Sequence, residues 1–475
     1  MKFKSPFFIA LSFMIVNLAV RIGFLASQDI ALDEPFTLFW SQQSLVDIWK
    51  LAAFENNPPL HFIITHFWVN LFGLDAFWVR LPSLLFTLAG IGLLIEFVAK
   101  RRSLFAAIFM GVLLTLSTEN IFYSQEARAY SLLFLLTVLA LRGIYKIIDN
   151  PTNSLFYIEL SIVNILLIYT HYLSIWIFIA QVITWLIFSR SIAAFRKSIP
   201  AIVLFLLGFS PLVLAAIARI NHMQGVDTWV PDAKVSQLYG NINIMLNGAS
   251  GSLAFILITV TGIAFGIKNI NRDKIISKDL LITTFWFLII YVGLFLQSML
   301  FQSVFIPRYL FFCSVPLFVA MVFFIDTLIT LSWLRFAAVL LLIVAMLPGY
   351  SMNPENHREM KQLVGYISSQ NTPKTALVIC PASFDLAYIY HANRDIFKSP
   401  NNYRNALENR AIYPVDHIDQ LPDSIKSFSN RIIFLDADSK FTLPNNSILQ
   451  ALEHDFKLKS RQHIDLIFDV YVFER

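Results

Sequence analysis

Cysteine and charge are both scarce in this sequence. Only two cysteines occur among 475 residues, Cys313 and Cys380, and their wide separation fits neither a disulfide framework nor a metal-binding spacing. Charged residues make up 14% of the chain, whereas soluble globular chains carry about 25%. No Gly-rich phosphate loop, internal repeat or low-complexity stretch is apparent. These absences argue against cysteine redox chemistry and against a nucleotide-binding loop.

Apolar residues are abundant instead. They make up 57% of the chain, the mean hydropathy is +0.65, and phenylalanine alone accounts for 45 residues. They come in blocks of roughly 17–22 residues, each long enough to cross a bilayer as a helix. We therefore expect a polytopic α-helical membrane protein with about eleven transmembrane helices. The predicted spans lie near 6–26, 79–99, 103–118, 129–147, 155–171, 173–189, 199–218, 251–267, 280–300, 309–328 and 335–350.

The basic residues test the order of these spans. Clusters fall in alternate loops, as the positive-inside rule requires if Lys2 and Lys4 are cytoplasmic. The net charge of the chain is only +5, and its basic residues cluster in short loops. This pattern indicates membrane topology and not nucleic-acid binding. We read the first apolar block as a retained span because it is too long for a signal peptide. The basic clusters are 100–102, Arg142 with Lys146, Arg190 with 196–197, and 268–278.

Two shorter apolar segments follow the first span. Leu60 to Phe72 has about 13 residues, too few to cross a bilayer, and counting it as a span would place the 100–102 cluster outside. We expect a helix lying at the membrane interface, with Pro58 and Pro59 before its start. The segment from Gln42 to Phe54 is a candidate for a second such helix.

The chain changes character near residue 350. We expect residues 1–350 to form the transmembrane domain and residues 351–475 a small α/β domain on the non-cytoplasmic side of the plasma (inner) membrane. Polar and apolar residues mix in the tail, with strand-like runs at 376–380, 431–435 and 465–473 and an amphipathic helix at 357–369.

The acidic pair Asp33-Glu34 follows the first span on the predicted outer face. Neighbouring apolar helices hold this loop near the membrane, and such an interface disfavours the charged form of a carboxyl group. The loop therefore offers a better proton acceptor than a solvated acid does. An ordinary solvated turn is the alternative, and two adjacent acids do not decide between the two.

Three further clusters fall on the same predicted face. Glu126 and Arg128 precede the fourth span, Arg308 precedes the tenth, and His171 lies in the short turn between the fifth and sixth. A guanidinium at that depth can bind a phosphate with two hydrogen bonds. The structural alternatives are a Glu-Arg pair that fixes a helix end, an arginine that anchors a helix, and a histidine that caps one. The loop from Arg219 to Ser250, with Trp229 and Tyr239, is a candidate lid.

Acids, arginines and histidines at one depth suit sugar transfer from a lipid-phosphate carrier. Six motifs are also similar, in order, to those of polyprenol-dependent membrane glycosyltransferases of the GT-C type. That group includes the dolichyl-phosphate-mannose protein mannosyltransferases, the bacterial aminoarabinose lipid A transferase and the galacturonosyl transferases. The motifs are the acidic pair, 57–62 continuing to 71–73, 79–83, 123–130, 169–172 and 307–309.

The resemblance covers roughly residues 1–350 and implies roles for individual residues. Asp33 matches the presumed base, with Glu34 as its neighbour. Arg128 and Arg308 would hold the phosphate of a polyprenyl-phosphate sugar donor, together with Arg80. The remaining candidates from these motifs are His61, Glu126, Tyr130, His171, Tyr172 and Tyr309. The luminal repeat domains of protein mannosyltransferases are not visible, which favours a lipid or glycan acceptor over a protein.

A metal ion is not expected to be required. A divalent ion could bind through the acids, His61 or His66. His61 and His66 are five residues apart, however, so they do not lie on one face of a helix as a pair of ligands. Three other functions remain open: a translocator of lipid-linked glycans, a surface polysaccharide polymerase or ligase, and a structural scaffold. A translocator would place its ionisable residues near the midplane. A polymerase or ligase would use a pyrophosphate-linked donor.

Overall fold

The computed structural model describes residues 6–52, 55, 57–222, 230–266, 277–422, 425, 430–438 and 446–475. It divides into two compact units, and each contains segments that are distant in sequence. Unit 1 comprises residues 1–25, 46–61 and 80–354. Unit 2 comprises residues 26–45, 62–79 and 355–475. The acidic loop after the first apolar block thus belongs to the same unit as the tail.

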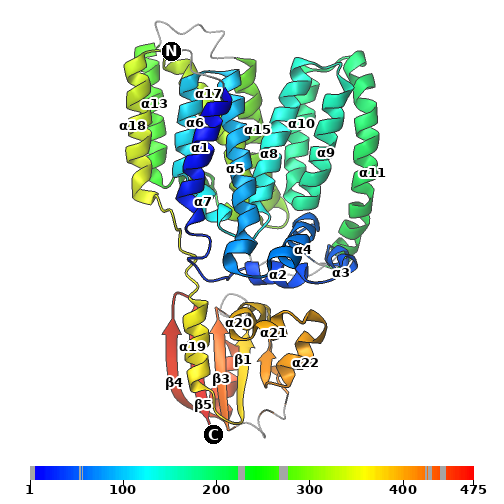
Figure 1. The fold of residues 1–475 in the computed structure, drawn as a ribbon, viewed down its shortest axis with the longest axis vertical. Coiled ribbons are helices and arrows are strands. Elements are labelled where there is room, and N and C mark those ends of the chain that lie inside the picture. Colours follow the sequence, from blue (N-terminus) through cyan, green and yellow to red (C-terminus); the bar gives the residue numbers. More distant parts are fainter. Residues whose placement is uncertain are drawn as a thin grey trace. The chain divides into compact units, whose positions relative to one another are not determined.

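Unit 1 is a bundle of apolar helices packed side by side (Figure 1). All eleven predicted apolar segments are helical in the described residues. The helices are α1 (Pro6–Ile22), α3 (Leu45–Leu51), α5 (Ala76–Arg101), α6 (Leu104–Leu116), α7 (Thr118–Ser124), α8 (Tyr130–Asp149), α9 (Ser154–Thr170), η1 (Tyr172–Ser174), α10 (Ile175–Phe188), α11 (Ile192–His222), α12 (Ser236–Met245), α13 (Ala249–Gly266), α15 (Lys278–Leu300), α16 (Pro307–Leu310), η2 (Phe311–Cys313), α17 (Ser314–Leu328), α18 (Ser332–Met346) and η3 (Leu347–Gly349).

The predicted number of eleven spans is not confirmed. Six helical segments of the described chain are long and apolar enough to cross a membrane, or up to eight if each of two bent pairs counts as one span. The segments 6–22, 154–170 and 172–188 are apolar but fall below the length of 18 residues. The difference arises because capping residues end these helices early: His171, for example, closes α9 and opens η1.

The two bent pairs break beside each other. α6 and α7 meet at 63°, and α12 and α13 meet at 88°. Asn247, at the second break, accepts a hydrogen bond from the Thr118 N–H at 2.9 Å and donates to the carbonyl oxygen of Leu116 at 2.6 Å. One side chain thereby satisfies backbone groups that the break in α6/α7 leaves open, as an apolar setting requires.

Ion pairs join several helix ends of unit 1. Arg101, at the end of α5, contacts Asp149 at 2.7 Å and Asp279 at 3.3 Å, which lie at the end of α8 and the start of α15. Lys146 in the last turn of α8 contacts Glu159 on α9 at 2.6 Å. The predicted basic clusters at 100–102 and 142–146 therefore lie at one end of the bundle. Lys2 and Lys4 lie outside the described residues, and so do residues 268–276 of the predicted cluster 268–278.

Unit 2 contains a five-stranded sheet in the order β2-β1-β3-β5-β4. β1, β2 and β3 run parallel, while β5 pairs antiparallel with both β3 and β4. The strands are β1 (Thr375–Cys380), β2 (Ile412–Pro414), β3 (Arg431–Ala437), β4 (Lys457–Ile464) and β5 (Phe468–Glu474). The helices of the tail are α19 (Met360–Gln370), η4 (Ala382–Phe384), α20 (Asp385–Ala392), α21 (Arg394–Phe397), η5 (Pro400–Asn402), α22 (Tyr403–Glu408), η6 (Ile418–Gln420) and α24 (Ser447–Asp455).

The small α/β domain predicted for the tail is thus present. The predicted runs at 376–380 and 431–435 correspond to β1 and β3, and the amphipathic helix corresponds to α19. The third run, predicted from Asp465, begins only at Phe468, because Asp465 has a φ of 55° in the turn before β5. Strand β4 is too polar for its sequence to have indicated a strand.

Two helices from the first loop complete unit 2. α2 (Glu34–Ser41) follows the acidic loop, and α4 (Leu60–Phe72) has the predicted bounds; its residues from Phe62 on belong to unit 2, whereas Leu60 and His61 belong to unit 1. α4 ends where Gly73 adopts a φ of 79° and its N–H bonds the carbonyl oxygen of Val69 at 2.8 Å. A residue without a side chain takes this left-handed cap at little cost. Of the second predicted helix, 42–54, residues 45–51 form α3, and Ala53 and Phe54 lie outside the described residues.

Candidate functional site

The structure gives the two acids of the first loop different surroundings within unit 2. Asp33 is half-buried and caps the N-terminus of α2 without a side-chain cap hydrogen bond. Glu34 is 1% exposed, and its Oε2 accepts the Ala31 N–H at 3.4 Å. Leu32, just before the pair, has a φ of 53°. Such a conformation is costly for a bulky residue and occurs in tight turns and at functional sites.

The loop before the acids is fastened to the tail inside unit 2. The Asp29 carboxylate contacts the Lys361 ammonium at 2.7 Å and accepts the Lys361 N–H at 2.8 Å. Burial alone would raise the pKa of Asp29, but these bonds to Lys361 outweigh it and lower the pKa. The His391 Nε2 lies 2.8 Å from the carbonyl oxygen of Ile30, and the Asn356 N–H donates to Gln28 at 2.6 Å.

These fastening contacts were not predicted from the sequence. The partners are separated by 328 to 361 residues, so no local pattern connects them. These polar contacts, which are partly buried or exposed, hold the backbone immediately before Asp33 in place. The orientation of α2 and its N-cap is therefore fixed by the folded tail as well as by the first loop.

Most of the other predicted residues lie in unit 1, where three motifs meet. Tyr130 begins α8, His171 caps η1 and Tyr309 lies in α16. The ring centroids of Tyr130 and His171 are 6.4 Å apart, and those of His171 and Tyr309 are 5.5 Å apart. Tyr123 extends this line of rings, with its centroid 4.9 Å from that of Tyr130.

Two arginines accompany these rings. Arg128 is 7% exposed in the loop before α8, and the Arg308 guanidinium lies 5.3 Å from the ring centroid of Tyr309. Burial, together with the positive charges of Arg128 and Arg308, lowers the pKa of His171 to about 4. Both arginines thus act on the same imidazole. Two motifs that are far apart in the sequence therefore bring positive charge to the surroundings of one imidazole.

His171 is neutral in this setting. Its Nδ1 accepts the Leu173 N–H at 3.2 Å, which caps η1. His61 is similar: burial lowers its pKa to about 3, with a further contribution from Arg128. Neither imidazole carries the second proton that would make it a cation at neutral pH, so the positive charge near these rings belongs to the arginines.

The remaining predicted residues have structural contacts. Arg80 is 2% exposed and donates from Nη1 to the carbonyl oxygen of Leu25 at 2.9 Å. The Tyr172 hydroxyl donates to the carbonyl oxygen of Ala52 at 3.2 Å. Glu126 is half-buried, and its carbonyl oxygen accepts the Arg128 N–H at 2.9 Å. This last bond forms the tight turn that holds the arginine before α8. Tyr239 of the predicted lid is exposed on α12, whereas Trp229 lies outside the described residues.

Two buried polar residues were not predicted from the sequence. Arg21 in α1 is fully buried and donates to the carbonyl oxygen of Leu114 at 3.2 Å and to Asn120 at 3.1 Å. Glu119 in α7 is 8% exposed, and neither carboxylate oxygen has a hydrogen-bond partner among the described residues. An arginine inside an apolar block, and an acid just before the 123–130 motif, were the signals that could have identified them.

A metal site is not apparent in the part of the chain that the structure describes. Within it, no group of three or more His, Cys, Asp or Glu side chains is placed to hold an ion. His61, one residue through which a metal could have bound, is buried near Arg128, and this charge disfavours a cation there.

Comparison with known proteins identifies the fold. No protein-family profile matches the sequence, and neither does any curated protein. Among solved structures, ArnT from Cupriavidus metallidurans matches over 97% of both chains, with a TM-score of 0.64 and 15% identity in the apo state. The same protein bound to undecaprenyl phosphate gives a TM-score of 0.60 at 14% identity. An oligosaccharyltransferase from Archaeoglobus fulgidus, complexed with Zn and sulfate, matches 91% of this chain and 68% of its own, with a TM-score of 0.52 and 9% identity.

Proposed function

Because the chain shares its fold over nearly its whole length with an aminoarabinose lipid A transferase of the GT-C type, we propose that it is a membrane glycosyltransferase. It moves a sugar from a polyprenyl-phosphate donor to a lipid or glycan acceptor on the non-cytoplasmic face. The match over 97% of both chains carries this proposal, since both the helical part and the tail are included. The sequence motifs quoted above point to the same group independently.

Arg128 and Arg308 are assigned to the donor phosphate. The Arg308 guanidinium lies against Tyr309, Tyr309 packs against His171, and both arginines act on the His171 imidazole, which supports a shared cationic environment there. Paired guanidinium groups bind phosphate oxygens through charge-assisted hydrogen bonds. The similar fold of ArnT, solved with undecaprenyl phosphate bound, supports a donor of this chemical class. Arg80 retains a supporting role as a third, more deeply buried cation.

Asp33 is assigned as the general base and Glu34 as its positioning neighbour. Asp33 is half-buried at the N-terminus of α2, and its side chain does not cap the helix. Glu34 is buried and bonds the backbone of Ala31, which suits a group that holds the loop. The costly φ of Leu32 supports a functional role for this turn.

The reaction is a single displacement. The acceptor oxygen attacks the anomeric carbon while Asp33 removes its proton, and the bond from that carbon to the phosphate oxygen breaks. The bonding electron pair leaves with the polyprenyl phosphate, and the arginines stabilise the growing negative charge. The transition state is oxocarbenium-like, and the anomeric configuration is inverted. No metal ion is required, so a chelator should leave transfer unchanged.

Deletion of the gene in the source organism tests the proposal. Mass spectrometry of extracted lipids and glycans should show one sugar-modified species lost and unmodified acceptor gained. Wild-type protein and the Asp47→Asn variant should restore the species, whereas Asp33→Asn should not. Asp47 lies in the same loop, paired with Lys50 on the exposed face of α3, and serves as the matched control. Restoration by Asp33→Asn would remove the base assignment.

The same strain separates transfer from its rivals. A translocator would leave a finished lipid-linked glycan trapped on the cytoplasmic face. In a purified system, transfer from a pyrophosphate-linked but not a monophosphate-linked donor would replace our proposal with a polymerase or ligase.

The proposed location puts the N-terminus in the cytoplasm and residues 351–475 outside. Both native cysteines are buried, so a thiol reagent should label only a cysteine introduced on the surface. A membrane-impermeant maleimide should label Asn371→Cys in intact cells and should label Arg196→Cys only after lysis. The reverse pattern would invert the topology.

A further inference from the structure

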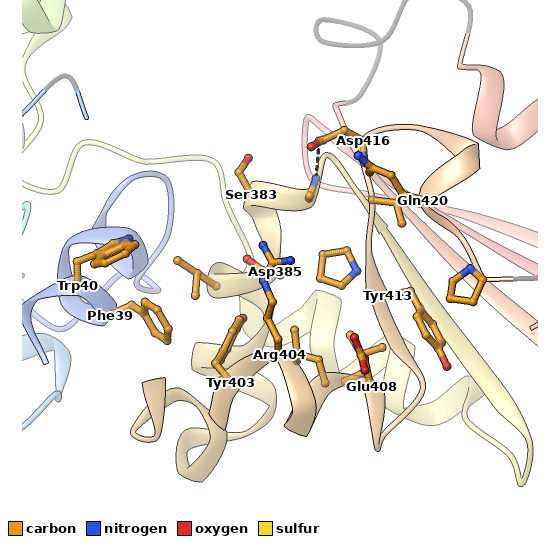
Figure 2. Close-up of a pocket in the computed structure, with 17 residues that line it drawn as sticks. Phe39, Trp40, Ser383, Asp385, Tyr403, Arg404, Glu408, Tyr413, Asp416 and Gln420 are labelled. Atoms are coloured by element: carbon orange, nitrogen blue, oxygen red, sulfur yellow. Dashed lines mark hydrogen bonds between the residues drawn. The ribbon is translucent and has the colours of Figure 1, made fainter. Parts of the chain in front are cut away.

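A cavity in unit 2 is not accounted for by the proposed reaction. It has a volume of about 610 Å³, within the range of roughly 300–1,000 Å³ typical of small-molecule sites. None of the residues predicted to be functional lines it. Its walls come from α2, η4, α20, α22, β2 and η6, so segments from residue 39 to residue 422 meet around it (Figure 2).

The cavity lies where the fold favours a ligand. β1 ends at Cys380 and β2 ends at Pro414, and residues directly after both strands contribute to the lining. These strands run parallel, with corresponding ends at one edge of the sheet. Ligands of open α/β sheets bind outside the carboxyl ends of the strands.

One side of the cavity is aromatic. Phe39 and Trp40 of α2 line it beside Tyr403 of α22, and the ring centroids of Phe39 and Tyr403 are 4.8 Å apart, so these two rings are in direct contact (Figure 2). Phe39 is buried in this contact, whereas Trp40 is only half-buried and keeps part of its ring free. The negative face of such a ring attracts the polarised C–H groups of a sugar.

The other side carries hydrogen-bonding groups. Tyr403 is 7% exposed, and its hydroxyl lies beside the Asp385 carboxyl, with which it interacts. Arg404 follows Tyr403 in α22, and its side chain points towards Asp385 of α20 (Figure 2). The Asp416 Oδ1 accepts the Ala382 N–H at 2.9 Å, which fixes that carboxylate at the rim.

The lining charges select against anions. Asp385, Glu408 and Asp416 contribute three carboxyl groups, and Arg404 contributes one guanidinium. A phosphate or carboxylate ligand would meet net repulsion, which excludes the donor phosphate as occupant. A neutral or amine-bearing ligand rich in hydroxyl groups fits both the aromatic and the polar side.

We propose that this cavity binds a saccharide unit without negative charge, its ring against Trp40 and its hydroxyl groups on Tyr403 and Asp385. The further statement that this saccharide belongs to the acceptor rests on the proposed function. Asp33 caps the start of α2 and Trp40 lies near its end, so one short helix links base and cavity. Seven residues of helix span about 10 Å. Occupation of the cavity would hold an acceptor within reach of the base.

Saturation-transfer NMR on the full-length protein in detergent tests the binding without donor or turnover. The probes are methyl β-glucoside, glucosamine and glucuronate. The first two should receive saturation, with glucuronate binding about tenfold more weakly or not at all, because like charges face each other. Trp40→Ala should lower the affinity for both positive probes at least fivefold, and Tyr403→Phe, which keeps the ring, should lower it less. Trp333→Ala, an exposed tryptophan on α18, is the matched control and should change nothing.

The outcomes are distinguishable from failure of the proposed function. Absence of saturation for all probes, equal binding of glucuronate, or insensitivity to Trp40→Ala would each overturn the saccharide site. If the probes bind as expected but gene deletion changes no glycan, the site stands and the transferase assignment falls. If transfer occurs and Trp40→Ala leaves the acceptor KM unchanged, the site is not part of acceptor binding.

Discussion

Asn247 bonds Thr118 across two broken helices: its side chain accepts the Thr118 N–H at 2.9 Å and donates to the neighbouring Leu116 carbonyl oxygen at 2.6 Å. A second acceptor, the carbonyl oxygen of Met346, lies 3.2 Å away. A single amide therefore connects the α6/α7 break, the α12/α13 break and the end of α18.

Replacement of Asn247 by glycine should loosen this junction. Asn247 has a φ of 59°, which glycine adopts freely, so the variant removes only the side-chain hydrogen bonds. We expect a loss of about 2–4 kcal/mol, because buried backbone groups are left without partners. Thermal unfolding in detergent measures it, with the exposed Asn150→Ala as control. An unchanged midpoint would show that the breaks hold without the amide.

The donor phosphate should depend on both arginines. Arg308→Ala and Arg128→Ala should each weaken binding of undecaprenyl phosphate by about 10- to 100-fold, the value of a charge-assisted hydrogen bond. Lysine at either position should restore only part of the affinity, since it offers no bidentate contact. Native mass spectrometry or a thermal-shift titration gives the dissociation constant.

Two controls sharpen that measurement. Arg196→Ala removes an exposed arginine from α11 and should not alter binding. Undecaprenol, which lacks the phosphate, should bind wild-type and variants equally. Equal losses for both lipids would mean that the arginines support the fold and do not contact the phosphate.

The buried carboxyl group of Glu119 should lower the free energy of unfolding. Both of its oxygens are buried without hydrogen-bond partners among the described residues, and an apolar replacement removes that penalty. We expect Glu119→Met to raise the unfolding free energy by about 1–3 kcal/mol, with Glu119→Gln in between. A lower unfolding temperature for both variants would contradict this. A gain in stability accompanied by a loss of transfer would mark Glu119 as functional.

Asp385 should make unit 2 sensitive to pH. Burial raises its pKa from 3.8 to about 6, so the folded state disfavours the carboxylate. The contribution of Asp385 to the free energy of unfolding is greatest below the pKa of this group in the unfolded chain. It falls as the pH rises from about 4 to about 6 and does not change further above that. The loss is about 2 kcal/mol, allowing for partial solvent screening.

The Asp385→Asn variant removes that slope. Its unfolding temperature should equal that of wild type near pH 4 and exceed it above pH 6. Asp395→Asn on the neighbouring α21 provides the comparison, and its profile should follow wild type. A parallel pH profile for Asp385→Asn would show that Asp385 does not titrate as its burial implies.

Local signals predicted much of the fold. Two prolines before Leu60 and a glycine after Phe72 bound α4, and both are readable in the sequence. The apolar blocks were all helical because an apolar run of that length has few alternatives. The number of spans was not confirmed, because interior caps such as His171 and breaks such as Asn247 shorten or bend helices at residues that hydropathy does not register.

The candidate site divides in the same way. Motif residues with local meaning, such as Tyr130, His171 and Tyr309, were identified from the sequence and meet in unit 1. Arg21 was missed because its partners lie on α6 and α7, about a hundred residues away, and only folding brings them together. The cavity lined by Trp40 and Tyr403 was missed for the same reason: its residues belong to no common motif.

The partners of the acidic loop emerge late in synthesis. The partner of Gln28 is Asn356, which is synthesised 328 residues later, and the partner of Asp29 is Lys361, which is synthesised 332 residues later. At about 5–20 residues per second, that delay is roughly 16–66 seconds. Unit 2 therefore closes only near the end of translation, after the apolar helices have left the ribosome. In a nascent or prematurely terminated chain, the loop that carries Asp33 lacks these contacts. The proposed base in the first tenth of the chain is therefore positioned only after the last quarter has been synthesised and folded.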